Sequence, residues 1–243
     1  MAMLPKRPQK IQALANRFIN RNDRNKNIPI ASPDGMYEKT YYEFVEHESL
    51  LGWMTNDWLD GTILHWWCMH MYEMISKEEF NSCAFFNPTI IQERVCVQES
   101  NFAIKHILST FEAHKEKDIF LAPYLQDAHW VLFLICPKTR MGYIFDSYNR
   151  DKKKTSKTFY LSNIVERAFD NSFKWTMQEC NQQKDLWECG YYVMKFIFDT
   201  LHIKQKSFLD QLHDSRRAFR QDELDGWVLS AGAKFFVDYC SDD

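Results

Sequence analysis

Three side chains far apart in the sequence have the types needed for nucleophilic catalysis. Cys189 precedes an apolar run, residues 191–198, that predicts a helix, and the dipole of a helix favours a thiolate at its N-terminus. His129 begins one strand-like run, and Asp146 ends another. Together they predict a thiol nucleophile, an imidazole base and a carboxylate that orients the base.

The relation between the histidine and the aspartate follows from strand pairing. Residues 129–136 and 141–146 are strand-like and flank a turn, which predicts a β-hairpin. If the turn centres on Pro137-Lys138, His129 lies directly opposite Asp146, with Cβ atoms about 4.5–5.5 Å apart. A register shift of two residues keeps both side chains on one face, whereas a shift of one separates them. A strand-end histidine and a turn-initiating aspartate without chemistry are the alternative.

The setting of Cys189 separates it from the other cysteines. Polar residues precede it, and Gly190 follows it, where a glycine lets the backbone pass close to a substrate. The side-chain amide of Gln183 and the backbone N–H of Cys189 would together form an oxyanion hole. Plain burial is the alternative for any cysteine, and it is what we expect of the other six. These are Cys68, Cys83, Cys96, Cys136, Cys180 and Cys240.

The remaining pattern predicts an α+β fold with a mixed central sheet flanked by helices. The run 129–136 is apolar almost throughout, which is typical of a strand buried on both faces. We expect a helix from Thr55 or Asn56 to about Ser76, and a second helix over 98–115 whose buried stripe includes Phe102 and Leu108. The other expected elements are one short strand within 27–48, a strand within 83–91, strands at 119–125 and 173–177, and helices at 189–203 and 222–240.

Residues 1–45 are predicted to be a basic N-terminal extension and lead-in, and residues 46–243 the catalytic domain. The basic side chains of residues 1–26 are dispersed rather than gathered in one block. This favours a solvated leader helix or linker over a nuclear-targeting or polyanion-binding arm. They are Lys6, Arg7, Lys10, Arg17, Arg21, Arg24 and Lys26.

Composition narrows the class of protein. The chain has 243 residues and a net charge of −3, so we expect no nucleic-acid binding by the core domain. No apolar stretch is long enough for a membrane span, and seven scattered cysteines suit a reducing, intracellular setting, the nucleus or the cytoplasm. His65, Cys68 and His70 do not share one helix face, and no nucleotide-binding loop is present. We therefore expect no metal and no cofactor, and nothing demands more than a monomer.

The order of the motifs resembles the catalytic signature of the Ulp1/SENP family (clan CE, family C48), proteases specific for ubiquitin-like proteins. The motifs are His129-Trp130, Asp146, and Gln182-Gln183 followed by Glu188-Cys189-Gly190, and residues 58–64 are similar to the family's W-L-N-D-x-I-I helix start. The resemblance spans residues 50–240. The amino-acid sequence of residues 187–195 is similar to that of Ulp1-like domains carried by plant transposable elements.

The resemblance implies a papain-like or adenain-like fold and a role for each matching residue. Cys189 would be the nucleophile, His129 the general base and acid, Asp146 its orienting carboxylate, and Gln183 the oxyanion donor. Trp58 and Trp130 would roof a narrow tunnel over the Gly-Gly end of a modifier, most simply SUMO. Core packing is the alternative for both indoles.

Two departures from the family pattern affect the choice of ligand. Gly61 replaces an acidic residue that contacts the modifier in the family, and Glu188 replaces the usual aspartate before the cysteine. The first departure keeps NEDD8 and ubiquitin open as alternatives to SUMO. A catalytically idle module that binds a modifier is a further alternative, and acetyl transfer on a related fold ranks last.

Overall fold

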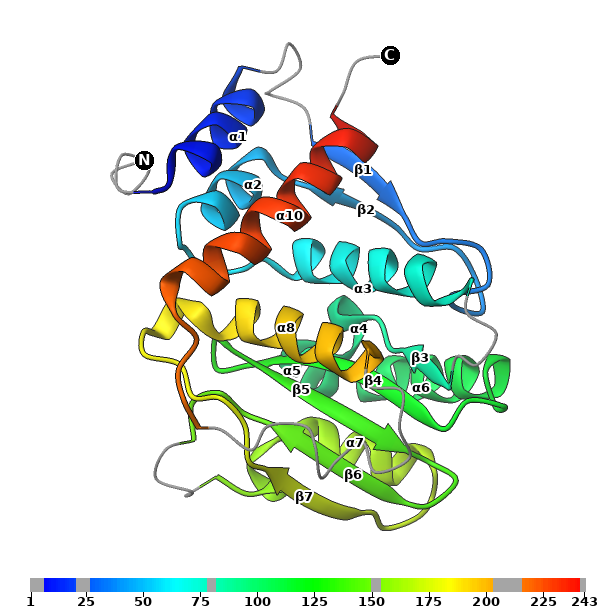
Figure 1. Cartoon of the computed structure of the whole chain (residues 1–243). Coiled ribbons are helices and arrows are strands. Elements are labelled where there is room, and N and C mark those ends of the chain that lie inside the picture. The colour runs from blue at the N-terminus through cyan, green and yellow to red at the C-terminus, as the bar shows by residue number, and fades with distance from the viewer. Residues whose placement is uncertain (1–6, 21–26, 78–81, 150–153, 203–215, 241–243) are drawn as a thin grey trace.

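The computed structural model describes residues 7–20, 27–77, 82–149, 154–202 and 216–240. A five-stranded sheet with strand order β3-β4-β5-β6-β7 lies at its centre (Figure 1). The two outer pairs, β3-β4 and β6-β7, are parallel, and the inner pairs are antiparallel, so the sheet is mixed as expected. The strands are β3 (Cys83–Phe85), β4 (Ile119–Gln126), β5 (His129–Cys136), β6 (Met141–Phe145) and β7 (Lys174–Gln178).

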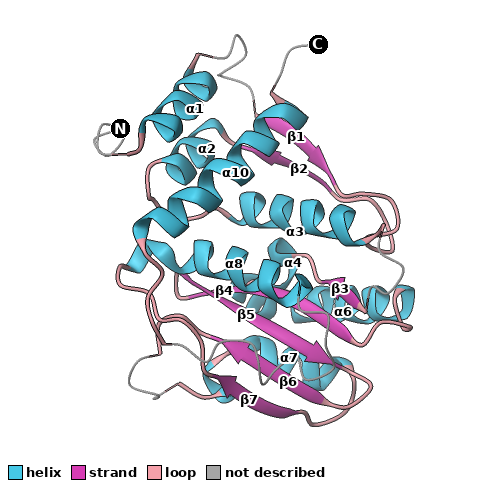
Figure 2. Cartoon of the chain, viewed as in Figure 1, coloured by secondary structure: helices cyan, strands magenta, loops and turns pink. Residues whose placement is uncertain are grey.

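Helices cover both faces of the sheet, as Figure 2 shows. On one face, Leu132 and Leu134 of β5 share a core with α3 (Gly61–Ile75) and α8 (Cys189–His202). On the other, Val131 and Phe133 share a second core with further helices. Two buried faces explain why β5 is apolar at almost every position. These helices include α5 (Glu93–Gln98), α6 (Ser100–Ala113) and α7 (Tyr160–Ala168).

The N-terminal segment packs into the fold. Phe18 of α1 (Gln9–Ile19) is buried, and its ring lies 5.3 Å from that of Phe236 on α10 (Gln221–Tyr239). Arg7 is buried as well, and donates to the Asp225 carboxylate at 2.6 Å and to the Met54 carbonyl at 3.1 Å. The expectation of a solvated leader helix is therefore wrong. Where the domain boundary lies stays a prediction.

Residues 27–48 form two short strands rather than one. β1 (Ile28–Ala31) pairs antiparallel with β2 (Tyr42–Val45), and α2 (His47–Met54) follows. The helix expected to start at Thr55 or Asn56 starts later. The Thr55 hydroxyl donates back to the Leu51 carbonyl and Asn56 has a φ of 62°, so α2 ends here; Asp60 caps α3 by accepting from the Thr62 N–H at 2.8 Å.

Two further expectations need correction. The strand expected over 83–91 stops at Phe85, because Pro88 begins the short helix α4 (Pro88–Ile91) at a position where its missing N–H costs nothing. In α6, Ile107 is buried as expected, but Phe102 and Leu108 are exposed, and His106 lies on the buried face instead. The described residues also include the 3-10 turns η2 (Ser156–Thr158) and η3 (Leu186–Glu188).

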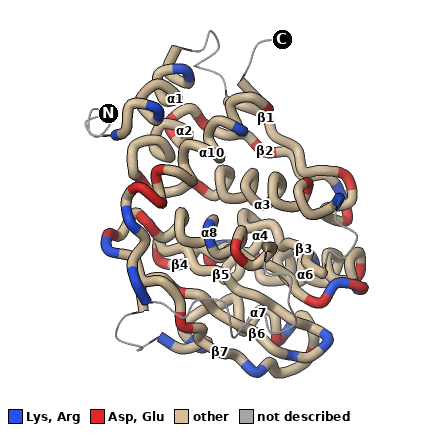
Figure 3. The backbone as a smooth tube through the Cα atoms, viewed as in Figure 1, with Lys and Arg blue, Asp and Glu red and all other residues tan. Residues whose placement is uncertain are grey.

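Charged residues lie around the sheet rather than in its centre. The strands β4, β5 and β6 contain no Lys, Arg, Asp or Glu, and they are tan throughout in Figure 3. Within the described residues, no helix combines the length and the apolar character that crossing a membrane requires.

Candidate active site

The predicted hairpin is present, with a register that differs by two residues. Leu132 faces Phe145 and Cys136 faces Met141, because the turn uses four residues, 137–140. In this register His129 and Asp146 are diagonal neighbours on one face instead of direct partners. Their side chains still meet at the end of the hairpin.

The histidine and the aspartate form a short hydrogen bond. His129 Nε2 donates to Asp146 Oδ1 at 2.7 Å, and the backbone N–H of Tyr148 donates to the same oxygen at 2.8 Å. Because the ionised carboxylate can only accept, the proton of the neutral imidazole lies on Nε2. Nδ1 therefore carries the lone pair that can accept a proton.

The other carboxylate oxygen of Asp146 has a cationic partner. Lys154 Nζ donates to Oδ2 at 2.9 Å. Burial alone would raise the pKa of Asp146, but the hydrogen bond and charge of His129 and the ammonium of Lys154 outweigh it and hold that pKa below its usual value. The carboxylate is therefore ionised at neutral pH.

Cys189 is the first residue of α8, and α8 packs against β5. The thiol is 0% exposed, and the backbone N–H of Trp130, next to His129, reaches it. Burial raises the pKa of this thiol; the N–H groups of Trp130, Gly190 and Cys189 itself lower it, but by less. The expectation that the helix N-terminus would favour the thiolate is thus outweighed by desolvation.

Gly190 allows a close approach, but to the chain itself. A Cβ at this position would lie 2.5 Å from the Cβ of Leu59, so only glycine fits. The Leu59 carbonyl in turn accepts from the Trp130 indole N–H at 2.9 Å. Leu59 is thereby held between α8 and β5, beside the thiol, and side chains here must move before a substrate reaches the sulfur.

The two tryptophans differ in exposure. Trp130 is 2% exposed and belongs to the core, whereas Trp58 is 47% exposed. Core packing is therefore excluded for Trp58. The Tyr191 hydroxyl donates to the carbonyls of Trp53 and Asp57, at 2.9 and 3.2 Å, and so ties the segment before Trp58 to α8.

Gln183 is buried, and its amide is held in place. Its Oε1 accepts from the Ser147 hydroxyl at 2.5 Å, and its Nε2 donates to the Asp185 carbonyl at 2.9 Å. Its backbone N–H donates to the Ser147 carbonyl at 2.8 Å. These contacts fix the amide between the segment after Asp146 and the turn η3 that leads into Cys189.

Comparison with known proteins places this geometry in a family. Residues 57–222 match the model of the Ulp1 protease family, C-terminal catalytic domain. The chain belongs to this family. It is by family a cysteine peptidase, and the recognition made from its motifs is confirmed.

Solved structures of Ulp1-like proteases share the fold. The yeast Ulp1 protease domain in complex with Smt3, the yeast orthologue of SUMO, superposes with a TM-score of 0.65 at 13% identity, covering 95% of each chain. A Chaetomium thermophilum Ulp1-like SUMO protease domain gives 0.57 at 13% identity, covering 93% of this chain and 88% of that one. The Xanthomonas campestris effector XopD bound to ubiquitin gives 0.54 at 18%, covering 73% and 91%. A search of curated proteins finds no match.

Sequence reasoning missed several residues that organise this Ulp1-family site. The Gln182 side chain joins two loops, because its Nε2 donates to the Asp146 carbonyl at 3.0 Å and its Oε1 accepts from the Asn149 N–H at 3.0 Å. The Gln182-Gln183 pair could be seen in the sequence, but the different contacts of the two side chains could not be predicted from it. Lys154 gave no signal, because its contact depends on the course of the chain after the hairpin.

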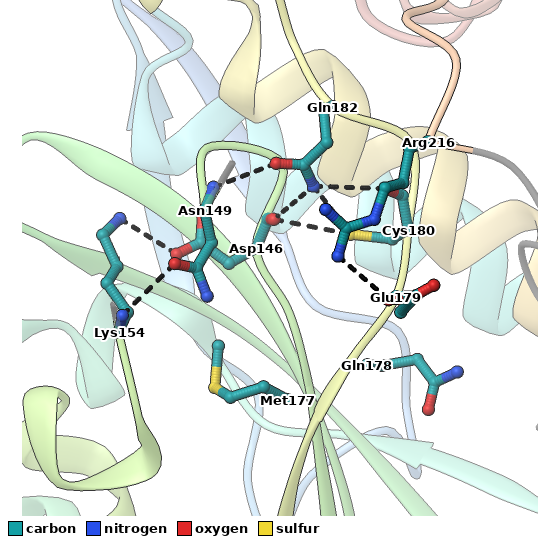
Figure 4. A pocket seen from close by; sticks show the side chains of 9 residues that line it. All are labelled: Asp146, Asn149, Lys154, Met177, Gln178, Glu179, Cys180, Gln182 and Arg216. Carbon is teal, nitrogen blue, oxygen red and sulfur yellow. Dashed lines mark hydrogen bonds and ion pairs between the residues drawn. The ribbon is translucent and has the colours of Figure 1, made fainter. Parts of the chain in front are cut away.

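A cavity of about 210 Å³ lies beside Asp146, on the Lys154 side (Figure 4). It is distinct from the surroundings of Cys189, since neither Cys189 nor either of the two predicted tunnel tryptophans lines it. Its lining residues are Asp146, Asn149, Lys154, Met177, Gln178, Glu179, Cys180, Gln182 and Arg216.

Proposed function

We propose that this Ulp1-family peptidase cleaves after the C-terminal Gly-Gly of a ubiquitin-like modifier, as a C-terminal hydrolase and isopeptidase, with SUMO as the first candidate. One observation carries the proposal. His129 donates from Nε2 to Asp146 at 2.7 Å, which leaves Nδ1 as the base at the start of β5, where the next residue's N–H reaches the Cys189 thiol.

The roles in the reaction follow from this arrangement. His129 Nδ1 takes the proton of the Cys189 thiol, and the sulfur attacks the carbonyl carbon of the terminal glycine. The resulting oxyanion is held by the Cys189 N–H and by the amide of Gln183. The C–N bond then breaks, and His129 gives its proton to the leaving amine. Water, activated by His129, hydrolyses the thioester and restores the thiol.

The buried thiol gives a physical reason for selectivity. A modifier tail must pass side chains that cover the sulfur, and glycine is the residue slim enough to do so. We place Trp58, exposed on the surface, and Trp130, buried beside the thiol, on the path of this tail. Ordinary peptides, with a Cβ at every position, would be excluded.

The structural relatives support an order of candidates. The yeast Ulp1 domain was captured with the SUMO orthologue Smt3, and the Chaetomium protein is a SUMO protease, which favours SUMO for this chain. XopD was captured with ubiquitin, which favours ubiquitin as the second candidate. NEDD8 completes the set. We further propose that residues 46–243 act as a monomeric catalytic domain in the nucleus or cytoplasm. We also propose that an origin in a transposable element accounts for the amino-acid sequence of residues 187–195.

Modifier probes with a C-terminal electrophile test the proposal. We expect SUMO to form an adduct on Cys189, located by mass spectrometry, and the adduct to disappear in Cys189→Ala. Cys136→Ala is the matched control, because Cys136 is partly exposed and is therefore within reach of nonspecific alkylation. A folded sample that reacts with none of SUMO, ubiquitin and NEDD8 would overturn the proposal. Turnover no faster than that of Cys189→Ala would instead indicate an idle binding module.

A further inference from the structure

Asp146 accepts hydrogen bonds from two side chains at once. His129 donates to Oδ1 at 2.7 Å and Lys154 to Oδ2 at 2.9 Å, and Figure 4 shows the lysine reaching the carboxylate from the side of the cavity. Asp146 is almost completely buried, so water screens its charge poorly. A carboxylate that only oriented the histidine would need one of these two partners.

We propose that Lys154 is a positioning residue that shares the negative charge of Asp146 with His129 and thereby makes the imidazole a weaker base. The proposal rests on the proposed function for its catalytic meaning, although its electrostatic part stands without it. The carboxylate stabilises the imidazolium that forms when His129 takes up a proton. A second positive charge on the same carboxylate opposes that uptake.

The lysine is held in place rather than trailing into solvent. Its backbone N–H donates to Asn149 Oδ1 at 3.2 Å, and the Asn149 N–H donates to Gln182 Oε1 at 3.0 Å. Its side chain is 31% exposed, and its ammonium lies 5.9 Å from the centre of the Tyr148 ring. The chain of contacts leads from Lys154 back to the loop that precedes the nucleophile.

Within the described residues, few other charges compete at this point. The Tyr148 ring also flanks the His129 ring, with centroids 6.1 Å apart. Behind the carboxylate, the Cys180 thiol donates to the Asp146 carbonyl at 3.4 Å. The nearby Arg216 is engaged by Glu179 at 2.9 Å. In the part of the chain that the structure describes, Lys154 is thus the cation placed to act on His129.

The size of the effect follows from Coulomb's law. Two unit charges on opposite oxygens of one carboxylate are roughly 6 Å apart, which at an effective dielectric constant of about 20 amounts to about two pH units. Since Lys154 is partly exposed, solvent screening reduces this to about one pH unit. A weaker base deprotonates the thiol less readily but protonates the leaving amine more readily.

Substitutions of Lys154 test the proposal through the pH profile of kcat/KM. In Lys154→Met we expect the acid limb to move to higher pH by about one unit, because His129 then holds its proton more tightly. Lys154→Gln keeps a donor without the charge and should shift equally, whereas Lys154→Arg should restore the parent profile. Lys138→Met is the matched control, since Lys138 pairs with Asp118 at the opposite end of β5. An unshifted acid limb in both neutral variants would overturn the proposal.

A second measurement does not depend on substrate. In a Cys189→Ala background, NMR of isotope-labelled histidine follows the protonation of His129 directly. Adding Lys154→Met should raise the midpoint of this titration by about one pH unit. An unchanged midpoint would overturn the inference even if the modifier is cleaved. A raised midpoint would support it even if every modifier probe fails to react.

Discussion

Two histidine–carboxylate pairs in this molecule have nearly the same length and different surroundings. His129 lies 2.7 Å from Asp146 at the end of the sheet, and His65 lies 2.8 Å from Glu43 in the interior. In the second pair the other ring nitrogen is also engaged, by the Tyr37 hydroxyl at 3.1 Å. A short His–carboxylate contact therefore does not by itself define a catalytic site.

The interior pair joins elements instead of moving protons. Glu43 on β2 bonds His65 on α3 through one oxygen and accepts from the Thr89 hydroxyl on α4 through the other, at 2.7 Å. Burial alone would raise the pKa of Glu43, but these hydrogen bonds hold it below its usual value. His129 differs in that its bond to the carboxylate uses Nε2, which leaves Nδ1 for the role of base in the proposed mechanism.

The largest expected difference between the two pairs is in kcat/KM, when the carboxylate of each pair is replaced by an amide. We expect Asp146→Asn to lower kcat/KM by about a thousandfold, because the amide no longer fixes the tautomer or stabilises the imidazolium. Glu43→Gln should stay within about twofold of the parent, since it affects no reacting group. The measurement is modifier hydrolysis by both variants at matched folded concentrations. Equal losses would mean that the two pairs do not differ in the way described.

A second test displaces Cys189, the proposed nucleophile of the His129–Asp146 pair, which has no counterpart in the proposed role of the His65–Glu43 pair. Gly190→Ala places a methyl group against Leu59 and should reduce kcat/KM by about a hundredfold through misplacement of Cys189. Gly61→Ala is the control on the neighbouring segment, because its methyl group would meet atoms only at 3.8 Å or beyond. Activity of Gly190→Ala close to that of Gly61→Ala would contradict the close approach.

At the interior pair, we expect the effect of substitution to appear in the stability of the fold rather than in activity. Glu43→Gln should lower the free energy of unfolding by about 2 kcal/mol near neutral pH, because it removes the charge from buried hydrogen bonds. The pKa of Glu43 is lowered in the folded state, so this stability is present above the unfolded value of about 4.3 and is lost as pH falls through the folded value. Urea unfolding across this range should show the two proteins converging in acid; a constant difference would refute the linkage.

The smallest effect on stability is expected at the Tyr37 hydroxyl, which contacts His65 of the interior pair. Tyr37→Phe removes one partner of His65 and should cost about 1 kcal/mol in unfolding free energy without changing kcat/KM. Thermal unfolding and hydrolysis of a modifier substrate, measured on the same preparation, check both halves. A change in the pH profile would show that the interior pair communicates with the active site.

The sequence predicted the parts of the site that depend on local pattern. The apolar run of β5 and the pairing with β6 brought His129 and Asp146 together, and a register error of two residues did no harm because side chains alternate. The Cys189 helix was likewise predicted from periodicity. Trp58 was left between two interpretations, and the structure excludes core packing because the side chain is largely exposed.

Features that depend on long-range contacts could not be predicted. Lys154 reaches Asp146 only because the chain after the hairpin turns back, and no spacing rule encodes that. The start of α3 was misplaced because Thr55 can cap a following helix or close a preceding one, and tertiary packing decides. The thiol's pKa was misjudged because the sequence reveals a helix N-terminus but not the desolvation around it.

The phenol of Tyr191 has a mechanical consequence. It stands two positions after the sulfur-bearing residue on one rigid helix, and it grips the backbone on either side of the α2 terminus, at Trp53 and Asp57. Through these two hydrogen bonds, one side chain of α8 joins the helix that begins at Cys189 to the segment that leads into Trp58. The proposed entrance at Trp58 and the proposed nucleophile are therefore fixed to one another by a single phenol.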